Sequence, residues 1–453
     1  MTISVQPDLR SPALRTFVAD SAADQAAALQ RLRDELSASG GPLIEEDGSG
    51  ATLVTFVYIG PAAESVAVDS HAVMSRDTGD RALMTQVPGT EVWYQSIVTE
   101  YDELEVSYRF LVDSRTALFN VEQIESSTRT AESLNAYALD RQLAFRDDPF
   151  NQDRMMLDGK QLFEENRAVL GDATDLVRWE NILTLPKGRT NQALIARART
   201  RETTLTEHRI WSETFGDERT VSVHVPSDQY DGPYSVFFLL DGPGGIALGL
   251  PALMDELTER GEIRPTVTVY VHNKDFWSRS VEMVCNPQLV DQYAGELLPW
   301  VREHYDVSES AADVAVSGGS YGGLGSSWLA YSRPDLFGNV LSMSGSYWWG
   351  MKGAWGNNDA DSTVYGIEDE PEWLTRQFAA AERSAVRFYI AAGKLESQHL
   401  DGGISLLAAN RHLRTVLQAK GYDVHFDEYH GGHDRAGWRG ALIAGLRYLL
   451  PAR

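Results

Sequence analysis

Nearly continuous apolar runs recur through the second half of the chain, for example YSVFFLLDG (234–242), PTVTVYVHN (265–273) and ADVAVSGGS (312–320). Such runs are typical of central strands in a sheet that helices cover on both faces. Segments with helical spacing lie between them, as in 290–305. This alternation predicts a doubly wound α/β domain over residues 191–453.

The first half has a different pattern. Residues 22–38 have apolar residues near helical spacing, so we expect an N-terminal extension with a helix over 1–40. Short β-rich segments separated by turn signals follow, which predicts a β-sandwich over 41–170. Residues 171–190 are expected to be a linker. The full length of 453 residues also favours two domains over one.

Composition excludes several classes of function. The chain has 65 acidic and 40 basic residues, a formal charge of -25, so its surface should repel nucleic acid and anionic membranes. The single Cys285 excludes an intramolecular disulfide and a cysteine-based zinc cluster. No secretory signal and no apolar run approaching the ~20 residues of a membrane span is present. We therefore expect a soluble cytoplasmic protein.

The sequence VAVSGGSYGG (314–323) ends a predicted strand in glycines around Ser320. With a strand before it and a helix after it, the G-x-S-x-G pattern predicts a nucleophile elbow, a sharp turn that exposes the serine hydroxyl above the sheet. The alternative is a glycine turn whose serine caps the following helix. We favour Ser320 as a nucleophile.

A serine hydroxyl needs a base to take its proton, and in this fold class the base is a late histidine. In FDEYHGGHDRAGWRG the pair Gly431-Gly432 frees the backbone before His433, which we predict as the base, with His430 as the alternative. The other late histidines are less suitable. His412 is expected mid-helix, His425 mid-strand, and His399 follows its strand too closely.

The imidazole needs an acid placed between the serine and the histidine along the chain. Glu396, three residues after Gly393, is the predicted acid, and Asp401 stays open as an alternative. The oxyanion hole needs two backbone N–H groups. One is expected from Tyr321. The other is expected near Gly242 or Gly244 in FFLLDGPGG, but not from Pro243, which has no N–H.

Several segments together resemble the enterochelin (ferric siderophore) esterases, which are esterase-D type α/β-hydrolases. The likeness lies in LLDGPGG, in Arg279, Glu282, Asn286 and ELLP (296–299), in SGGSYGGLGSSWLAYSRPDLFGNVLSMSGSYWWG, and in GGHDRAGWRGAL. A weaker likeness to the immunoglobulin-like cap domain of this family covers MTQVPGTEVWYQSI, VSYRFLVD and DPFN. Residues 1–40 carry no recognisable likeness to the family.

The resemblance implies the same nucleophile, Ser320, and the same base, His433. The G-x-x-E segment of the family matches Gly393 to Glu396. The stretch between Glu396 and His433 is longer than in the family pattern, which keeps Asp401 open.

The resemblance also implies a substrate, an iron-loaded tris-catecholate lactone that is bulky, aromatic and anionic. No cofactor is implied, because the iron belongs to the substrate. Trp349 is expected to face the substrate, with Trp348 as a second contact or a core residue, and Arg279 to pair with catecholate oxygens unless it pairs with Glu282. A positive pocket is required within a negative protein, with further charges from Lys352, Arg435 or Arg439.

Two other functions remain open from the sequence. One is hydrolysis of feruloyl or carbohydrate esters by the same residues. The other is siderophore binding without catalysis, in which case Ser320 would not react with an organophosphonate ester.

Overall fold

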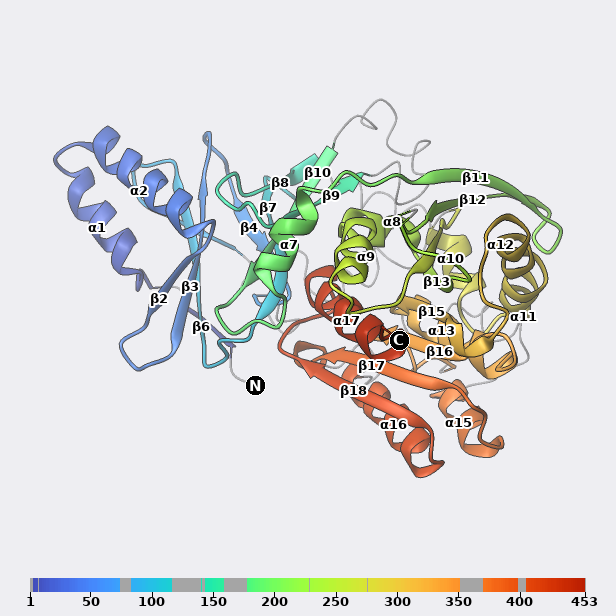
Figure 1. Cartoon of the computed structure of the whole chain (residues 1–453). Helices are drawn as coiled ribbons and strands as arrows, with labels where there is room; N and C mark the ends of the chain where they lie inside the picture. Colours follow the sequence, from blue (N-terminus) through green and yellow to red (C-terminus); the bar gives the residue numbers. More distant parts are fainter. Residues whose placement is uncertain are drawn as a thin grey trace. The chain divides into compact units, whose positions relative to one another are not determined.

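The computed structural model describes residues 3–6, 8–73, 83–115, 140, 143–158, 177–227, 229–274, 276–350, 370–397 and 405–452 (Figure 1). The described residues form two compact units. The first takes in the chain up to Asp158, residues 177–189 and the late segment His430–Ala436, whereas the second takes in Thr190–Tyr429 and the residues from Gly437 onward.

The first unit contains two antiparallel sheets. One has the order β1 (Ile3–Gln6), β6 (Val92–Thr99), β3 (Thr52–Ile59), β2 (Leu43–Glu46), and β5 (Thr85–Gln86) also pairs with β6. The other has the order β4 (Val66–Asp69), β7 (Glu105–Val112), β10 (Val177–Thr184), β9 (Arg154–Asp158), with β8 (Phe145–Arg146) beside β7. Aromatic rings join the sheets, with Phe56 5.0 Å from Tyr108 and Tyr58 5.4 Å from Phe110 between centroids. The predicted β-sandwich is confirmed.

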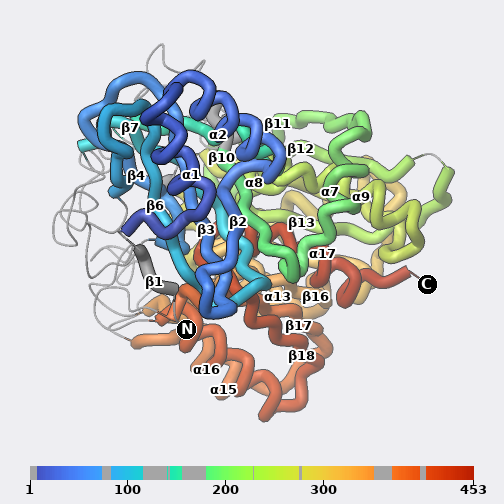
Figure 2. Tube along the Cα trace, turned by 90° about the vertical axis from the view of Figure 1, so that its left-hand side faces the viewer, coloured from blue at the N-terminus to red at the C-terminus, as the bar shows by residue number. Residues whose placement is uncertain are grey.

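The N-terminal 40 residues belong to this sandwich and are not a separate extension. Strand β1 pairs with β6, and helices α1 (Pro12–Ser21) and α2 (Gln25–Ser39) lie side by side (Figure 2). Ser11 and Asp24 cap the two helices, and Gly40 ends α2 at a φ of 78°. Their buried apolar residues share a core with the first sheet: Leu14, Phe17, Ala28, Leu32, Leu36, Leu43, Val57, Val87, Val92 and Tyr94.

The predicted linker over 171–190 is also wrong in its described part, because β10 occupies Val177–Thr184 and pairs with both β7 and β9. This strand is hard to recognise because it buries polar side chains that other residues bind. Asn181 is fully buried and accepts a hydrogen bond from the amide of Asp148 at 2.7 Å.

The second unit is built on one eight-stranded sheet with the order β11 (Thr206–Ser212), β12 (Asp217–His224), β14 (Thr266–Val271), β13 (Ser235–Leu240), β15 (Val314–Gly319), β16 (Asn339–Met343), β17 (Arg387–Gly393), β18 (Asp423–Tyr429). Strands β11, β12 and β14 pair antiparallel to one another. From β14 across β13, β15, β16 and β17 to β18, neighbouring strands pair parallel. The predicted α/β domain is confirmed.

Helices cover both faces of this sheet. Phe237 and Leu239 of β13 share one core with α7 (Gln192–Arg199), α9 (Leu250–Glu259) and α17 (Arg435–Leu449). Their neighbours Phe238 and Leu240 share the opposite core with α12 (Leu298–His304), α13 (Tyr321–Ser332), α15 (Trp373–Ala380) and α16 (Leu406–Ala419). Both sides of the strand are buried, which explains its continuous apolar sequence.

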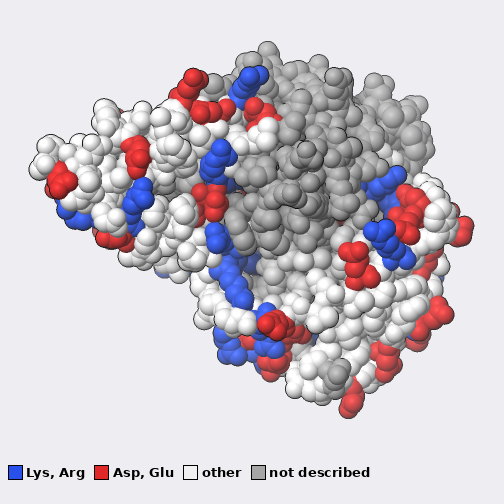
Figure 3. All heavy atoms as spheres, turned by 90° about the horizontal axis from the view of Figure 1, so that it is seen from above, with Lys and Arg blue, Asp and Glu red and all other residues white. Residues whose placement is uncertain are grey.

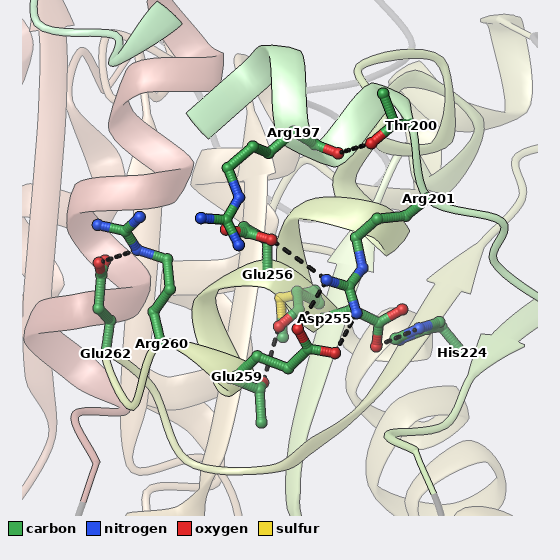
Figure 4. Close-up of polar contacts among 11 residues, drawn as sticks. Arg197, Thr200, Arg201, His224, Asp255, Glu256, Glu259, Arg260 and Glu262 are labelled. Carbon is green, nitrogen blue, oxygen red and sulfur yellow. Dashed lines mark hydrogen bonds and ion pairs between the residues drawn. The ribbon is translucent and has the colours of Figure 1, made fainter. Parts of the chain in front are cut away.

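Ion pairs fix α7 and the residues after it onto α9 (Figure 4). The Glu256 carboxylate is 1% exposed, and it pairs with Arg197 at 2.9 Å and Arg201 at 3.2 Å. Arg201 also pairs with Glu259, at the end of the same helix. Two guanidinium groups compensate the buried charge, which would otherwise be costly. Among the described helices, none is long and apolar enough to cross a membrane.

Candidate active site

Ser320 lies between strand β15 and helix α13 in a strained backbone conformation, with φ 58° and ψ −120°. A residue other than glycine rarely adopts a positive φ, and such strain persists only where surrounding structure enforces it. The amide of Ser320 donates to the carbonyl of Met343 at 2.9 Å, and its carbonyl accepts from the amide of Ser346 at 3.1 Å. These bonds tie the turn to β16 and the segment after it.

Glycines beside Ser320 make the turn possible. A Cβ at Gly318 would lie 2.6 Å from the backbone of Gly322, so the two arms of the turn approach too closely for any side chain. A Cβ at Gly319 would lie 2.7 Å from the ring of Trp438. The predicted elbow geometry is therefore present, with strand, sharp turn and helix in the expected order.

The Ser320 hydroxyl has a neighbour that the sequence did not reveal. Its Oγ lies 3.2 Å from the Oγ of Ser346, a side chain that is 1% exposed. Ser346 lies in the SGSYWW segment, from which the sequence predicts only aromatic site residues. A side-chain contact across 26 positions leaves no signal in local sequence.

The turn after β13 is held against the elbow. Asp241 has a φ of 62° and precedes the short helix α8 (Gly242–Ala247). Its carboxylate binds Arg279 of α10 (Phe276–Glu282) at 2.5 and 2.6 Å and also accepts from Asn273. Arg279 donates further to the carbonyl of Gly319 at 3.2 Å. One arginine thus connects the turn with the residue before Ser320.

This arrangement bears on two predicted site residues. The amide of Gly244 donates to the carbonyl of Asp241 at 2.9 Å, which favours Gly242 as the oxyanion donor in this turn. The carboxylate partner shown for Arg279 is Asp241, whereas Glu282 binds Arg219 at 2.9 and 3.0 Å. Both carboxylate oxygens of Asp241 accept hydrogen bonds from Arg279, so the guanidinium of Arg279 is occupied within the protein.

Glu396 lies in a short 3-10 turn after β17 and is 5% exposed. One carboxylate oxygen accepts a hydrogen bond from the amide of Gly393 at 2.9 Å. The side chain is thereby held at the carboxyl end of a parallel strand, where the sequence placed it. The alternative acid Asp401, like His399 and Lys352, lies outside the described residues.

The predicted base His433 lies in the segment His430–Ala436, which we call the histidine loop and which belongs to the first unit. The residues that flank this loop belong to the second unit and lie near the elbow. Tyr429 contacts the hydroxyl of Ser344 at 3.1 Å, and Trp438 donates to the same hydroxyl at 3.0 Å while its ring faces Gly319. The loop therefore leaves and rejoins the second unit close to Ser320.

The aromatic segment after β16 is more deeply buried than expected. Trp349 is fully buried and its ring is 6.1 Å from that of Trp373, whereas Trp348 is 4% exposed and lies 6.1 Å from the ring of Tyr321. Neither tryptophan offers a broad exposed face in this structure. The prediction that Trp349 faces the substrate is not supported by this burial.

Two further predicted cations, Arg435 and Arg439, lie within the described residues. Arg435 lies 3.7 Å from Glu180 in the first unit, and Arg439 is 2% exposed. Lys and Arg side chains alternate with Asp and Glu on the face shown in Figure 3. The predicted positive pocket stays a prediction.

The parallel sheet covered by helices, with a strand–turn–helix elbow at Ser320, defines the class of this protein as an α/β-hydrolase fold. Residues 212–449 match the Esterase family, which is more than half of the chain, and the protein belongs to that family. Residues 53–179 match the N-terminal domain of enterochelin esterases, so the chain has the domain composition of an enterochelin esterase.

Similar proteins cover most of the chain. It is 26% identical over 447 residues to the iron(III) enterobactin esterase of Dickeya dadantii, covering 96% of each chain. It is 31% identical over 242 residues to the iron(III) enterobactin esterase of Escherichia coli O6:H1, covering 52% of this chain and 55% of that one. The ferric enterobactin esterase structure from Salmonella typhimurium covers 90% of this chain and 96% of that chain, with a TM-score of 0.69 and 23% identity.

Proposed function

We propose that this protein is a serine esterase that hydrolyses ester bonds of a ferric catecholate siderophore of the enterobactin type. The strained conformation of Ser320 at a turn between a central strand and a helix carries the proposal, because it is the geometry of a nucleophile elbow and strain of this kind is typical of functional sites. The full-length similarity to an iron(III) enterobactin esterase supports the substrate class.

In the proposed mechanism, Ser320 Oγ attacks the ester carbonyl carbon while His433 takes the hydroxyl proton. Glu396 is the proposed acid that orients the imidazole and stabilises its positive charge. The N–H groups of Tyr321 and Gly242 are the proposed donors to the oxyanion. His433 then returns the proton to the leaving alkoxide, which departs as an alcohol.

The second half of the cycle repeats these steps with water. His433 removes a proton from the water, whose oxygen attacks the acyl carbon, and then gives that proton to Ser320 Oγ, which leaves as its hydroxyl. No cofactor is needed, since the iron arrives with the substrate, and each cut ester weakens the chelate. We place the reaction in the cytoplasm, where a single buried thiol such as Cys285 stays reduced.

Recognition of the substrate needs groups other than those first predicted. Arg279 is engaged by Asp241 and Trp349 is buried, so we give neither a direct contact with the siderophore. Trp348, beside Tyr321 of the elbow, is the aromatic residue that we retain as a proposed contact.

Mass spectrometry of the products tests the proposal. Wild-type protein incubated with ferric enterobactin should release linear dihydroxybenzoylserine products, and Ser320→Ala should release none while keeping its fold by circular dichroism. Iron-free enterobactin and a feruloyl ester, run in parallel, distinguish the substrate classes. Undiminished turnover by Ser320→Ala would refute the nucleophile, and faster turnover of the feruloyl ester would refute the substrate.

A further inference from the structure

His430, the first residue of the histidine loop, makes three contacts with residues 101–105 of the same unit. Its carbonyl accepts a hydrogen bond from the amide of Glu105 at 2.8 Å. Its Nδ1 lies 3.2 Å from the carboxylate of Glu103, and its ring stacks on Tyr101 with centroids 4.6 Å apart and planes inclined by 21°. Backbone, charge and ring contacts thus fix both the position and the orientation of this residue.

Two further contacts hold the rest of the loop. A Cβ at Gly432 would lie 2.3 Å from the Cβ of His71, so the backbone of Gly432 rests directly on that side chain. Arg435 lies 3.7 Å from Glu180 of β10, whose other carboxylate oxygen accepts from Ser107 at 3.0 Å. His433 is therefore placed between one anchor at Gly432 and another at Arg435.

The segment that binds His430 is itself fixed. The amide of Tyr101 donates to the hydroxyl of Thr99 at 3.1 Å. The carbonyls of Asp102 and Leu104 accept from the amides of Lys187 and Leu185, at 2.8 and 2.9 Å. Glu105 begins the central strand β7. Residues 101–105 are therefore a firm support and not a loose turn.

We propose that the β-sandwich acts as a clamp that holds the histidine loop, and that His430 is a positioning residue of this clamp and not the base. The clamp consists of Tyr101, Glu103 and Glu105 with their partner His430. This inference rests on the proposed function, since it assigns the base to His433. It gives the N-terminal domain a catalytic purpose: ordering the loop in advance removes an entropy cost from each turnover.

Hydrogen exchange tests the clamp without reference to activity. Tyr101→Leu removes the stacked ring, and Glu103→Gln removes the charge. Amide exchange within 430–436 should rise roughly threefold to tenfold in Tyr101→Leu, the size of a stacked aromatic contact. Glu91→Gln is the matched control, because Glu91 is a similarly exposed carboxylate of the same unit whose partner is Arg33. Unchanged exchange of the loop in both clamp variants would overturn the proposal.

The rate at which an organophosphonate ester labels Ser320 links the clamp to catalysis. Tyr101→Leu and His430→Ala should each slow labelling on the order of tenfold, with KM for ferric enterobactin nearly unchanged. His430→Asn, whose side-chain amide nitrogen replaces Nδ1 as a donor to Glu103, should recover part of the rate. Complete loss of labelling in His430→Ala with normal labelling in Tyr101→Leu would make His430 the base and overturn the inference.

The two assays also separate this inference from the proposed function. Faster loop exchange with normal labelling would show that the order of the loop does not limit the reaction of Ser320, which removes the catalytic purpose of the clamp. Product release from ferric enterobactin is tested independently with Ser320→Ala. A failure of the substrate assignment would leave both readouts of the clamp unchanged.

Discussion

The guanidinium of Arg279 binds both carboxylate oxygens of Asp241, at 2.5 and 2.6 Å, and reaches the carbonyl of Gly319 at 3.2 Å. Asp241 begins the turn that contains Gly242, and Gly319 precedes Ser320. The pair therefore sets the distance between the proposed oxyanion turn and the proposed nucleophile. Its value lies in geometry, because a buried pair contributes little net stability.

We expect Arg279→Met to destabilise the protein by about 3 kcal/mol, because it leaves the Asp241 charge partly buried without its partner. Labelling of Ser320 should slow as well. Chemical denaturation measures the first effect. Arg209→Met is the control, since Arg209 and Glu218 form an exposed pair whose loss should change stability by less than about 0.5 kcal/mol. A stable Arg279→Met variant with weakened siderophore binding would instead restore Arg279 as a substrate contact.

Gly318→Ala should disrupt the elbow. The added methyl would lie 2.6 Å from the backbone of Gly322, and backbone cannot move aside cheaply. We expect a loss of about 1–3 kcal/mol in stability and a large loss of activity. Gly295→Ala provides the comparison, because a Cβ there meets nothing within 4 Å. Equal activity of the two variants would argue against a required close approach in the turn.

Ser346→Ala should slow the labelling of Ser320 by about fivefold, the value of one hydrogen bond of about 1 kcal/mol. The physical reason is that a hydroxyl donates only once. If Ser320 donates to the base, Ser346 must donate to Ser320 Oγ and hold it in place. Ser326→Ala is the control, since Ser326 is equally buried in α13 but bonds the carbonyl of Gly322. A normal rate in Ser346→Ala would show that the contact is incidental.

Asp148, in the DPFN segment of the sandwich, predicts a pH dependence of stability. Burial raises the pKa of Asp148 from 3.8 to about 6, although its carboxylate accepts from Tyr108 and from the amide of Phe150. The folded state then binds a proton more tightly than the unfolded state. The free energy of unfolding should therefore fall between about pH 4 and pH 6, by about 3 kcal/mol, and level off above.

Denaturant titrations of the wild type and Asp148→Asn at several pH values measure this effect. The difference between the two proteins isolates Asp148 from other titrating groups. The free energy of unfolding of Asp148→Asn should rise relative to that of the wild type as the pH increases from about 4 to about 6. A constant difference from pH 4 to pH 7 would contradict the raised pKa.

Local sequence predicted those parts of the structure whose signals are local. The sequence of strand β13 is apolar on both faces, which predicts a central strand. The glycines around Ser320 predict the turn. Strand β10 was missed because its buried Asn181 reads as polar, although Asp148 binds it. Glu282 was named as the alternative partner of Arg279 because it is near in sequence, whereas the true partner Asp241 is 38 residues away. Contacts between residues that are far apart in the sequence depend on the fold, so local sequence patterns do not predict them.

The position of β1 on β6 has a consequence for shortened forms of the protein. β1 covers the backbone of Ser96–Thr99, opposite the side occupied by β3. Proteolytic removal of the residues before Leu43 would remove β1 from the edge of the sheet, together with α1 and α2, and would expose apolar residues such as Val57 and Tyr94. An uncovered β-sheet border is a template for another chain. Loss of the residues before Leu43 would therefore make the protein prone to self-association through this sheet edge.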